Sequence, residues 1–148
     1  MKVKHIVLTT DLSEESLRPC EPMAEFARQL GAKITLLHVL QDLRVAPHGA
    51  PLAPAVSVAD MAKEAEDARA ALADMRTRLP EDVTIDVDVA VHENIPRGIA
   101  EYAQKHGADL IAMSTHGRTG FRHLVLGSVA EAVLRHSAVA VLSFPRSA

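Results

Sequence analysis

The sequence contains little cysteine and few aromatic residues. Cys20 is the only cysteine, so the chain can form neither an internal disulfide nor a zinc site built from several cysteines. Tryptophan is absent, and the aromatic residues are one tyrosine and three phenylalanines. Proteins that bind single-stranded nucleic acid usually stack bases on aromatic side chains, and a net charge of −3 gives no basic field to attract a phosphate backbone. The composition therefore predicts no nucleic-acid partner.

Long apolar runs are missing as well. No window of the sequence approaches the roughly 20 apolar residues that a membrane-crossing helix needs. Residues 1–5 lead into only a short apolar run, without the longer apolar region and small-residue cleavage site of a signal peptide. We therefore expect no membrane insertion and a cytoplasmic location, where a lone thiol remains reduced.

The apolar residues that are present make up 48% of the 148 positions, which is enough for the core of one domain covering residues 1–148. Nearly continuous apolar runs rich in β-branched residues are typical of parallel strands that are covered on both faces. Such runs occupy residues 5–9, 33–40, 108–113 and 138–142. Residues 83–89 instead alternate strictly between apolar and polar, which predicts a strand at a sheet edge with one face in solvent.

Helical patterns separate these runs, around residues 13–30, 58–79, 94–106 and 128–136. Pro19 and Pro22 predict irregular or kinked first turns in the first of these helices, and glycine follows the first and third, as at many helix ends. The second helix carries one apolar stripe at spacings of three and four, which favours packing on the sheet over a coiled coil. The stripe consists of Met61, Ala65, Ala68, Leu72, Met75 and Leu79.

The alternation of strand and helix predicts an open, doubly wound α/β domain with five parallel strands in the order 3-2-1-4-5 and four helices. Residues 41–57 contain three prolines and are expected to form a long loop after the second strand, a candidate lid rather than a domain linker. In such sheets, ligands bind beyond the carboxyl ends of the strands, where the winding direction reverses. The segments that follow the first and fourth strands are therefore the candidate binding segments.

The segment after the fourth strand, residues 114–128, is rich in glycine, hydroxyl and basic side chains. Glycine lets the main chain approach a ligand closely, and the free N–H groups at the start of the next helix attract anions. Ser128 and Glu131 match a capping box, which predicts the helix start, and Arg118 and Arg122 can add positive charge. The alternative is an ordinary capped helix after a glycine-bearing loop, but the combined context favours a phosphate site.

The segment after the first strand contains Asp11 and Ser13. Either side chain can cap the first helix. Alternatively, Asp11 and its neighbouring main chain contact a ribose or a base. The fold alone leaves both interpretations open.

Three segments together resemble the universal stress protein family, and the resemblance covers nearly the whole chain. They are residues 6–13, residues 36–39 with the sequence Leu-Leu-His-Val, and residues 115–128 with Thr-His-Gly-Arg at the start and Gly-Ser at the end. The nucleotide-binding branch of this family carries Gly-x-x-Gly, nine residues, and then Gly-Ser or Gly-Thr. Gly117, Gly127 and Ser128 match this pattern, whereas Ser114 replaces the first glycine.

The resemblance implies a fold of the adenine nucleotide alpha hydrolase type and a regulatory, stress-response module that binds ATP, ADP or AMP, with Mg²⁺ or Mn²⁺ as a candidate companion cation. It also implies a homodimer, which would form through the C-terminal edge strand. No metal site made of protein side chains alone is predicted. By resemblance, the nucleotide-binding residues are Thr9, Thr10, Asp11, Val39, Met113, Ser114, His116, Gly117, Arg118, Gly127, Ser128 and Val129.

Two other functions stay open at this point. The only candidate bases near the expected site are Asp11, His116 and His123, and no second carboxylate supports a two-metal centre, so at most slow ATP hydrolysis or autophosphorylation is expected and no catalytic residue is assigned. Ser114 also keeps open a dimeric interaction protein that binds no nucleotide. The histidines lack the spacing of a metal site, and His38 is expected to be a hydrogen-bonded histidine of the sheet.

Overall fold

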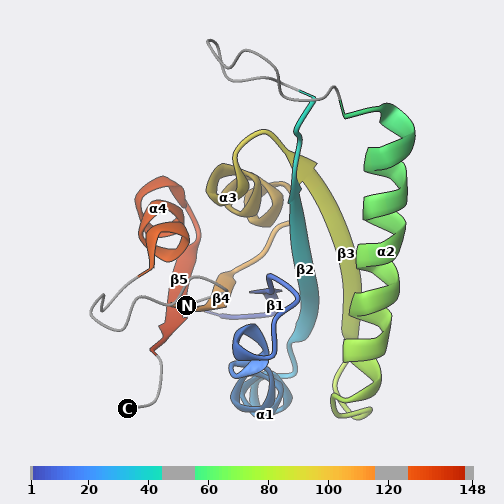
Figure 1. The fold of residues 1–148 in the computed structure, drawn as a ribbon. Coiled ribbons are helices and arrows are strands. Elements are labelled where there is room, and N and C mark those ends of the chain that lie inside the picture. The colour runs from blue at the N-terminus through green and yellow to red at the C-terminus, as the bar shows by residue number, and fades with distance from the viewer. Residues whose placement is uncertain (1, 45–55, 116–126, 146–148) are drawn as a thin grey trace.

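A computed structural model of the chain describes residues 2–44, 56–115 and 127–145, and within these ranges strands and helices alternate (Figure 1). The strands are β1 His5–Thr9, β2 Lys33–Gln41, β3 Ile85–His92, β4 Leu110–Ser114 and β5 Ala140–Phe144. The helices are α1 Cys20–Leu30, α2 Val58–Thr77, α3 Ile95–Lys105 and α4 Ser128–His136, with a 3₁₀ turn at Glu15–Leu17.

The strands form one sheet in the order β3-β2-β1-β4-β5, and all neighbouring pairs are parallel. This confirms the predicted fold class and strand order. β3 lies at one edge, as its alternating pattern indicated, but its second face is only partly in solvent. There the Tyr102 hydroxyl of α3 donates a hydrogen bond of 2.6 Å to Asp88 Oδ2.

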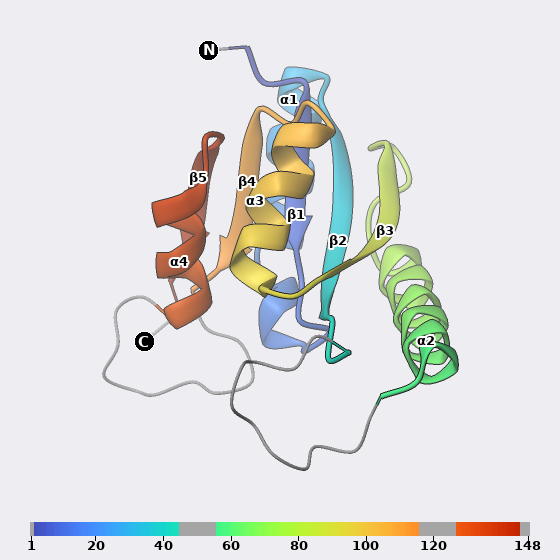
Figure 2. The same ribbon diagram turned by 90° about the horizontal axis from the view of Figure 1, so that it is seen from above.

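Helices cover both faces of the sheet, and two separate apolar clusters form the core (Figures 1 and 2). One cluster joins α1 and α2 to the sheet and contains the α2 stripe from Ala65 to Met75, with Leu72 completely inaccessible. Met61, the first residue of the stripe, is buried as well. The other cluster joins α3 and α4 to the opposite face through residues such as Ile99 and Val133. The chain is therefore doubly wound, with α1 and α2 on one side and α3 and α4 on the other.

The irregularity expected near Pro19 takes the form of a break between two elements. The 3₁₀ turn ends at Leu17, and α1 begins only at Cys20, with Pro19 as its N-cap. Helix α1 ends at Gly31, whose φ of 64° lies in the left-handed region that glycine adopts without strain. Helix α3 is followed by Gly107 with the same φ, so the glycine signals predicted both helix ends.

The capping box predicted at the start of α4 is wrong. Ser128 is already the first helical residue, and Gly127 is the N-cap, with no side-chain cap hydrogen bond. The carboxylate of Glu131 instead accepts a hydrogen bond of 2.6 Å from Arg135, one turn further along the helix. A true capping box occurs at α2, where Ser57 and Asp60 bond to each other's backbone N–H groups. No helix in the described ranges combines the length and apolar character that crossing a bilayer requires.

Cys20 is buried at the start of α1 and belongs to the core. Burial raises the pKa of its thiol to about 11. Because the thiolate is the reactive form, Cys20 is a packing residue rather than a nucleophile at neutral pH.

The buried imidazole of His5 links β1 to β2 and to the C-terminal end of α3. Its Nε2 lies 2.8 Å from Thr35 Oγ1 on β2, and its Nδ1 lies 3.2 Å from the carbonyl oxygen of His106. A neutral ring satisfies both contacts, donating through Nδ1 and accepting through Nε2. Burial, aided by the positive charge of Lys33, lowers the pKa of His5 below its ordinary value of 6.5.

This lowered pKa predicts a loss of stability in mild acid. In the pH range just below 6.5 the unfolded chain binds a proton at His5 that the folded chain does not, so the free energy of unfolding falls as the pH falls through that range. Urea unfolding of the wild type and of His5→Gln should show that the advantage of the wild type is smaller at about pH 5.5 than at about pH 7.5. An advantage that is independent of pH would contradict this interpretation of His5.

Candidate functional site

The candidate site lies where the winding of the sheet reverses. β1 is hydrogen-bonded to β2 on one side and to β4 on the other, and the connections from β1 and from β4 leave toward opposite faces. The carboxyl ends of β1 and β4 therefore lie side by side at the end of the sheet toward which its parallel strands run, called here the carboxyl end of the sheet (Figure 2). Parallel α/β domains bind ligands at this point.

The turn that follows β1 is held by a directed chain of hydrogen bonds. Leu12 N–H donates to Thr10 Oγ1 at 2.9 Å, and Ser16 Oγ donates to the carbonyl oxygen of Ser13 at 2.7 Å. Because that carbonyl can only accept, the 2.6 Å contact between Thr10 Oγ1 and Ser16 Oγ must use the proton of Thr10. The side chain of Thr10 is buried, and its proton already has an acceptor within the turn.

Asp11 and Ser13 shape the same turn. Asp11 Oδ1 accepts hydrogen bonds from the backbone N–H of Ser13, at 3.0 Å, and from the Ser13 hydroxyl. Ser13 Oγ in turn accepts from the backbone N–H of Ser16 at 3.3 Å. The side chain of Ser13 thus bonds to the 3₁₀ turn rather than to α1, and Asp11 organises the bend. Leu12 between them adopts a φ of 67°, which is uncommon for a residue other than glycine.

Two backbone hydrogen bonds hold the residues on either side of positions 116–126. Thr115 N–H donates to the carbonyl oxygen of Phe144 on β5, and Gly127 N–H donates to the carbonyl oxygen of Thr115, both at 2.9 Å. The second bond places the first turn of α4 beside the end of β4. Since Gly127 has no side chain to cap this turn, the first N–H groups of α4 and the positive end of its dipole remain suited to an anion.

The predicted site residues differ widely in exposure. Thr9, Thr10, Val39 and Met113 are buried, Asp11, Ser114 and Gly127 are half-buried, and Ser128 and Val129 are exposed. Val39 is covered by α3, which approaches so closely that a Cβ at Gly98 would lie 3.0 Å from Val39 Cγ1. The structure brings together the residues that end β1 and β4 and those that start α4, all at the carboxyl end of the sheet. His116, Gly117 and Arg118, together with Arg122 and His123, lie outside the described residues.

The sequence did not predict the parts that Ser16 and Thr115 play at this site, nor the hydrogen-bond partner of His38. Ser16 completes the hydroxyl chain, and Thr115 anchors both β5 and α4 through its backbone. His38 is hydrogen-bonded, as expected, but its partner is the carbonyl oxygen of Thr10, at 2.8 Å. No local pattern marks these contacts, because each partner is set by the tertiary fold.

The carboxylate of Asp42 already has a partner. At the end of β2, the hydrogen bond from Arg44 lowers the pKa of Asp42 to about 2, so this carboxylate is ionised and paired at neutral pH. Within the described ranges, no three His, Cys, Asp or Glu side chains gather closely enough to hold a metal ion.

The chain is therefore an open, doubly wound α/β domain. The start of α4, which has no side-chain cap, lies beside the end of β4. The model of the universal stress protein family matches residues 2–145. The chain belongs to this family. Universal stress protein MJ0531 of Methanocaldococcus jannaschii is 31% identical over 97% of this chain and 84% of its own length.

Solved structures of the family have the same fold. One is a universal stress protein in complex with cAMP, with a TM-score of 0.62 and 24% identity, covering 99% of this chain and 100% of its own. Another is the universal stress protein from Archaeoglobus fulgidus in complex with dAMP, with a TM-score of 0.62 and 22% identity, covering 97% of this chain and 98% of its own.

Proposed function

We propose that this chain binds an adenine nucleotide at the carboxyl ends of β1 and β4 and serves as a regulatory, stress-response module. One observation carries the proposal: the hydrogen bond from Gly127 to Thr115 holds the uncapped start of α4 beside the end of β4. Amides and dipole then face the space that a phosphate needs. The cAMP and dAMP complexes of related proteins support the choice of adenine as the base.

In this proposal the phosphates lie against the backbone of Gly127, Ser128 and Val129. The adenosine lies along the turn at Thr9, Thr10 and Asp11, where the hydroxyl proton of Thr10 is already engaged with Ser16. We also assign Met113, Ser114 and Val39 to this site, together with His116, Gly117 and Arg118, which lie outside the described residues. ATP with Mg²⁺ or Mn²⁺ suits this arrangement if the cation takes its ligands from the phosphates and water.

Titration calorimetry tests the proposal directly. ATP with Mg²⁺, AMP and cAMP are added to the purified protein, with GTP and inorganic phosphate as controls for the base and for the phosphate alone. We expect saturable binding of at least one adenine nucleotide, weaker binding of GTP, and no comparable binding of inorganic phosphate. If no adenine nucleotide gives heat or protects against thermal unfolding, the proposed function is wrong.

A second candidate function is interaction with another copy of the chain, and the exposure of β5 favours it. This strand forms the edge of the sheet, and Ala140 and Leu142 on it are exposed. An uncovered apolar edge strand is prone to pair with another chain. We propose a homodimer through β5, formed with or without nucleotide, and sedimentation velocity of the calorimetry samples decides between monomer and dimer.

A further inference from the structure

The imidazole of His38 reaches from one strand to the turn that follows its neighbour. His38 lies on β2, is half-buried, and places Nδ1 2.8 Å from the carbonyl oxygen of Thr10. A carbonyl oxygen only accepts, so Nδ1 carries the hydrogen. The geometry thereby fixes both the tautomer of the ring and its orientation.

Thr10 is the residue at which the chain leaves the sheet. The last residue pair of β1 and β2 is Thr9 with Leu37, and Thr10 N–H still donates to the carbonyl oxygen of Leu37 at 2.9 Å. The carbonyl oxygen of Thr10 is instead held by the side chain of His38. Both backbone groups of Thr10 are therefore tied to β2, one by the main chain and the other by an imidazole.

His38 acts from the face of the sheet opposite to Val39. Side chains alternate along a strand, and Leu36 and Leu40 belong to the cluster under α1 and α2, whereas Leu37 and Val39 belong to the cluster under α3 and α4. His38, two positions from both Leu36 and Leu40, shares their face. His38 therefore contacts the turn from the face covered by α1 and α2, whereas Val39 lies on the face covered by α3 and α4.

We infer that His38 is a positioning residue for the nucleotide site: it holds the main chain of Thr10 to Leu12 in the orientation that receives the adenosine. The inference rests on the proposed function for its ligand. Its physical content is independent of the ligand, because Leu12 with φ of 67° needs support from its surroundings, and the bond from His38 lies two residues before it.

Three substitutions separate this role from simple packing. In asparagine, the amide nitrogen is as many bonds from Cα as Nδ1 is in histidine, so His38→Asn keeps a donor for Thr10. In His38→Gln the donor lies one bond further out, at the place of Nε2, and His38→Leu removes it. We expect the Asn variant to bind the tightest adenine nucleotide within about threefold of the wild type, and the Gln and Leu variants to bind it about tenfold more weakly.

Amide hydrogen exchange in the nucleotide-free protein gives a second reading. Leu12 N–H bonds to Thr10 Oγ1 and Ser13 N–H bonds to Asp11 Oδ1, whereas Ile34 N–H bonds to Thr84 at the far end of the sheet. We expect exchange at Leu12 and Ser13 to be at least about tenfold faster in His38→Gln and His38→Leu, but near the wild-type rate in His38→Asn. Exchange at Ile34 should stay unchanged in every folded variant.

The two measurements fail in different ways. If the wild type binds no adenine nucleotide but exchange follows the expected order, the proposed function fails and the role of His38 in holding the turn stands. If the three variants weaken binding equally, or if exchange at Leu12 does not change, His38 is a packing residue and the inference is overturned. Should His38→Leu not fold, the comparison of Asn with Gln still decides.

Discussion

Replacement of Gly127 with valine is expected to weaken adenine-nucleotide binding by about 100-fold or more, because two or three charge-assisted hydrogen bonds to phosphate would be lost. Gly127 is the N-cap of α4, and its amide is fixed to Thr115. Branched methyl groups at this position would stand where a phosphate must approach the main chain. The backbone itself tolerates the change, since φ of −71° and ψ of 157° lie in the region that valine favours.

Calorimetry and thermal unfolding of the same variant distinguish the two effects. The loss of a favourable N-cap residue should cost about 1 kcal/mol of stability, so the protein stays folded while binding disappears. Leu134→Ala is the matched control, because Leu134 is an exposed residue on the same helix, away from its first turn, and binding should be preserved. An unchanged affinity of Gly127→Val would remove the first turn of α4 from the site.

Truncation of Leu72 to alanine is expected to lower the free energy of unfolding by about 2–5 kcal/mol. Leu72 is completely inaccessible and is the largest buried side chain of the α2 stripe, within the cluster that joins α2 to the sheet. Its removal leaves a cavity that alanine neighbours such as Ala65 and Ala68 are too small to fill. Domains of this size have only about 5–15 kcal/mol of stability, so the loss is a large share of the total.

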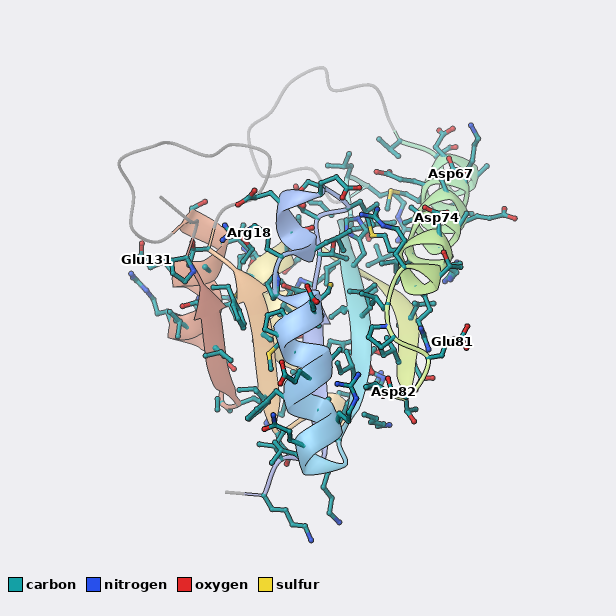
Figure 3. The ribbon with its side chains drawn as sticks, turned by 90° about the horizontal axis from the view of Figure 1, so that it is seen from below. Arg18, Asp67, Asp74, Glu81, Asp82 and Glu131 are labelled. Carbon is teal, nitrogen blue, oxygen red and sulfur yellow. The ribbon has the colours of Figure 1, made fainter. Side chains whose placement is uncertain are left out.

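Urea denaturation measures this loss, and Asp67→Ala is its control. Asp67 lies on the same helix, is exposed and is drawn in Figure 3 together with Asp74 on α2. Its replacement should change the stability by no more than about 0.5 kcal/mol. A cost below about 1 kcal/mol for Leu72→Ala would mean that α2 contributes little to the cooperative core.

The sheet was predictable because its signal is repeated at every level. Runs of β-branched residues gave the strands, and the alternation in residues 83–89 gave the edge position of β3. Helix starts were less predictable, since they depend on contacts beyond the local sequence. At α4, the pattern of Ser128 and Glu131 suggested a capping box, but the bond between Gly127 and Thr115 moves the N-cap back by one residue.

The location of the candidate site also followed from the sequence, but the hydrogen bonds within the site did not. Glycine and hydroxyl residues after two strands indicate where a ligand approaches. The direction of the hydroxyl chain from Leu12 to Ser13 depends on the position of Ser16 within the 3₁₀ turn. The contact of His38 with Thr10 joins residues 28 positions apart, and its partner becomes evident only once β1 and β2 are paired.

The hydrogen bond between Gly127 and Thr115 also has a consequence for the evolution of the connection between β4 and α4. The two positions that flank residues 116–126 are hydrogen-bonded to each other, and Thr115 is also bonded to Phe144 on β5. Doubling the length of a flexible loop costs only about 0.6 kcal/mol. A change in the number of residues between these two positions is therefore expected to leave β4 and β5 paired, because the bonds of Thr115 to Phe144 and Gly127 do not depend on that number.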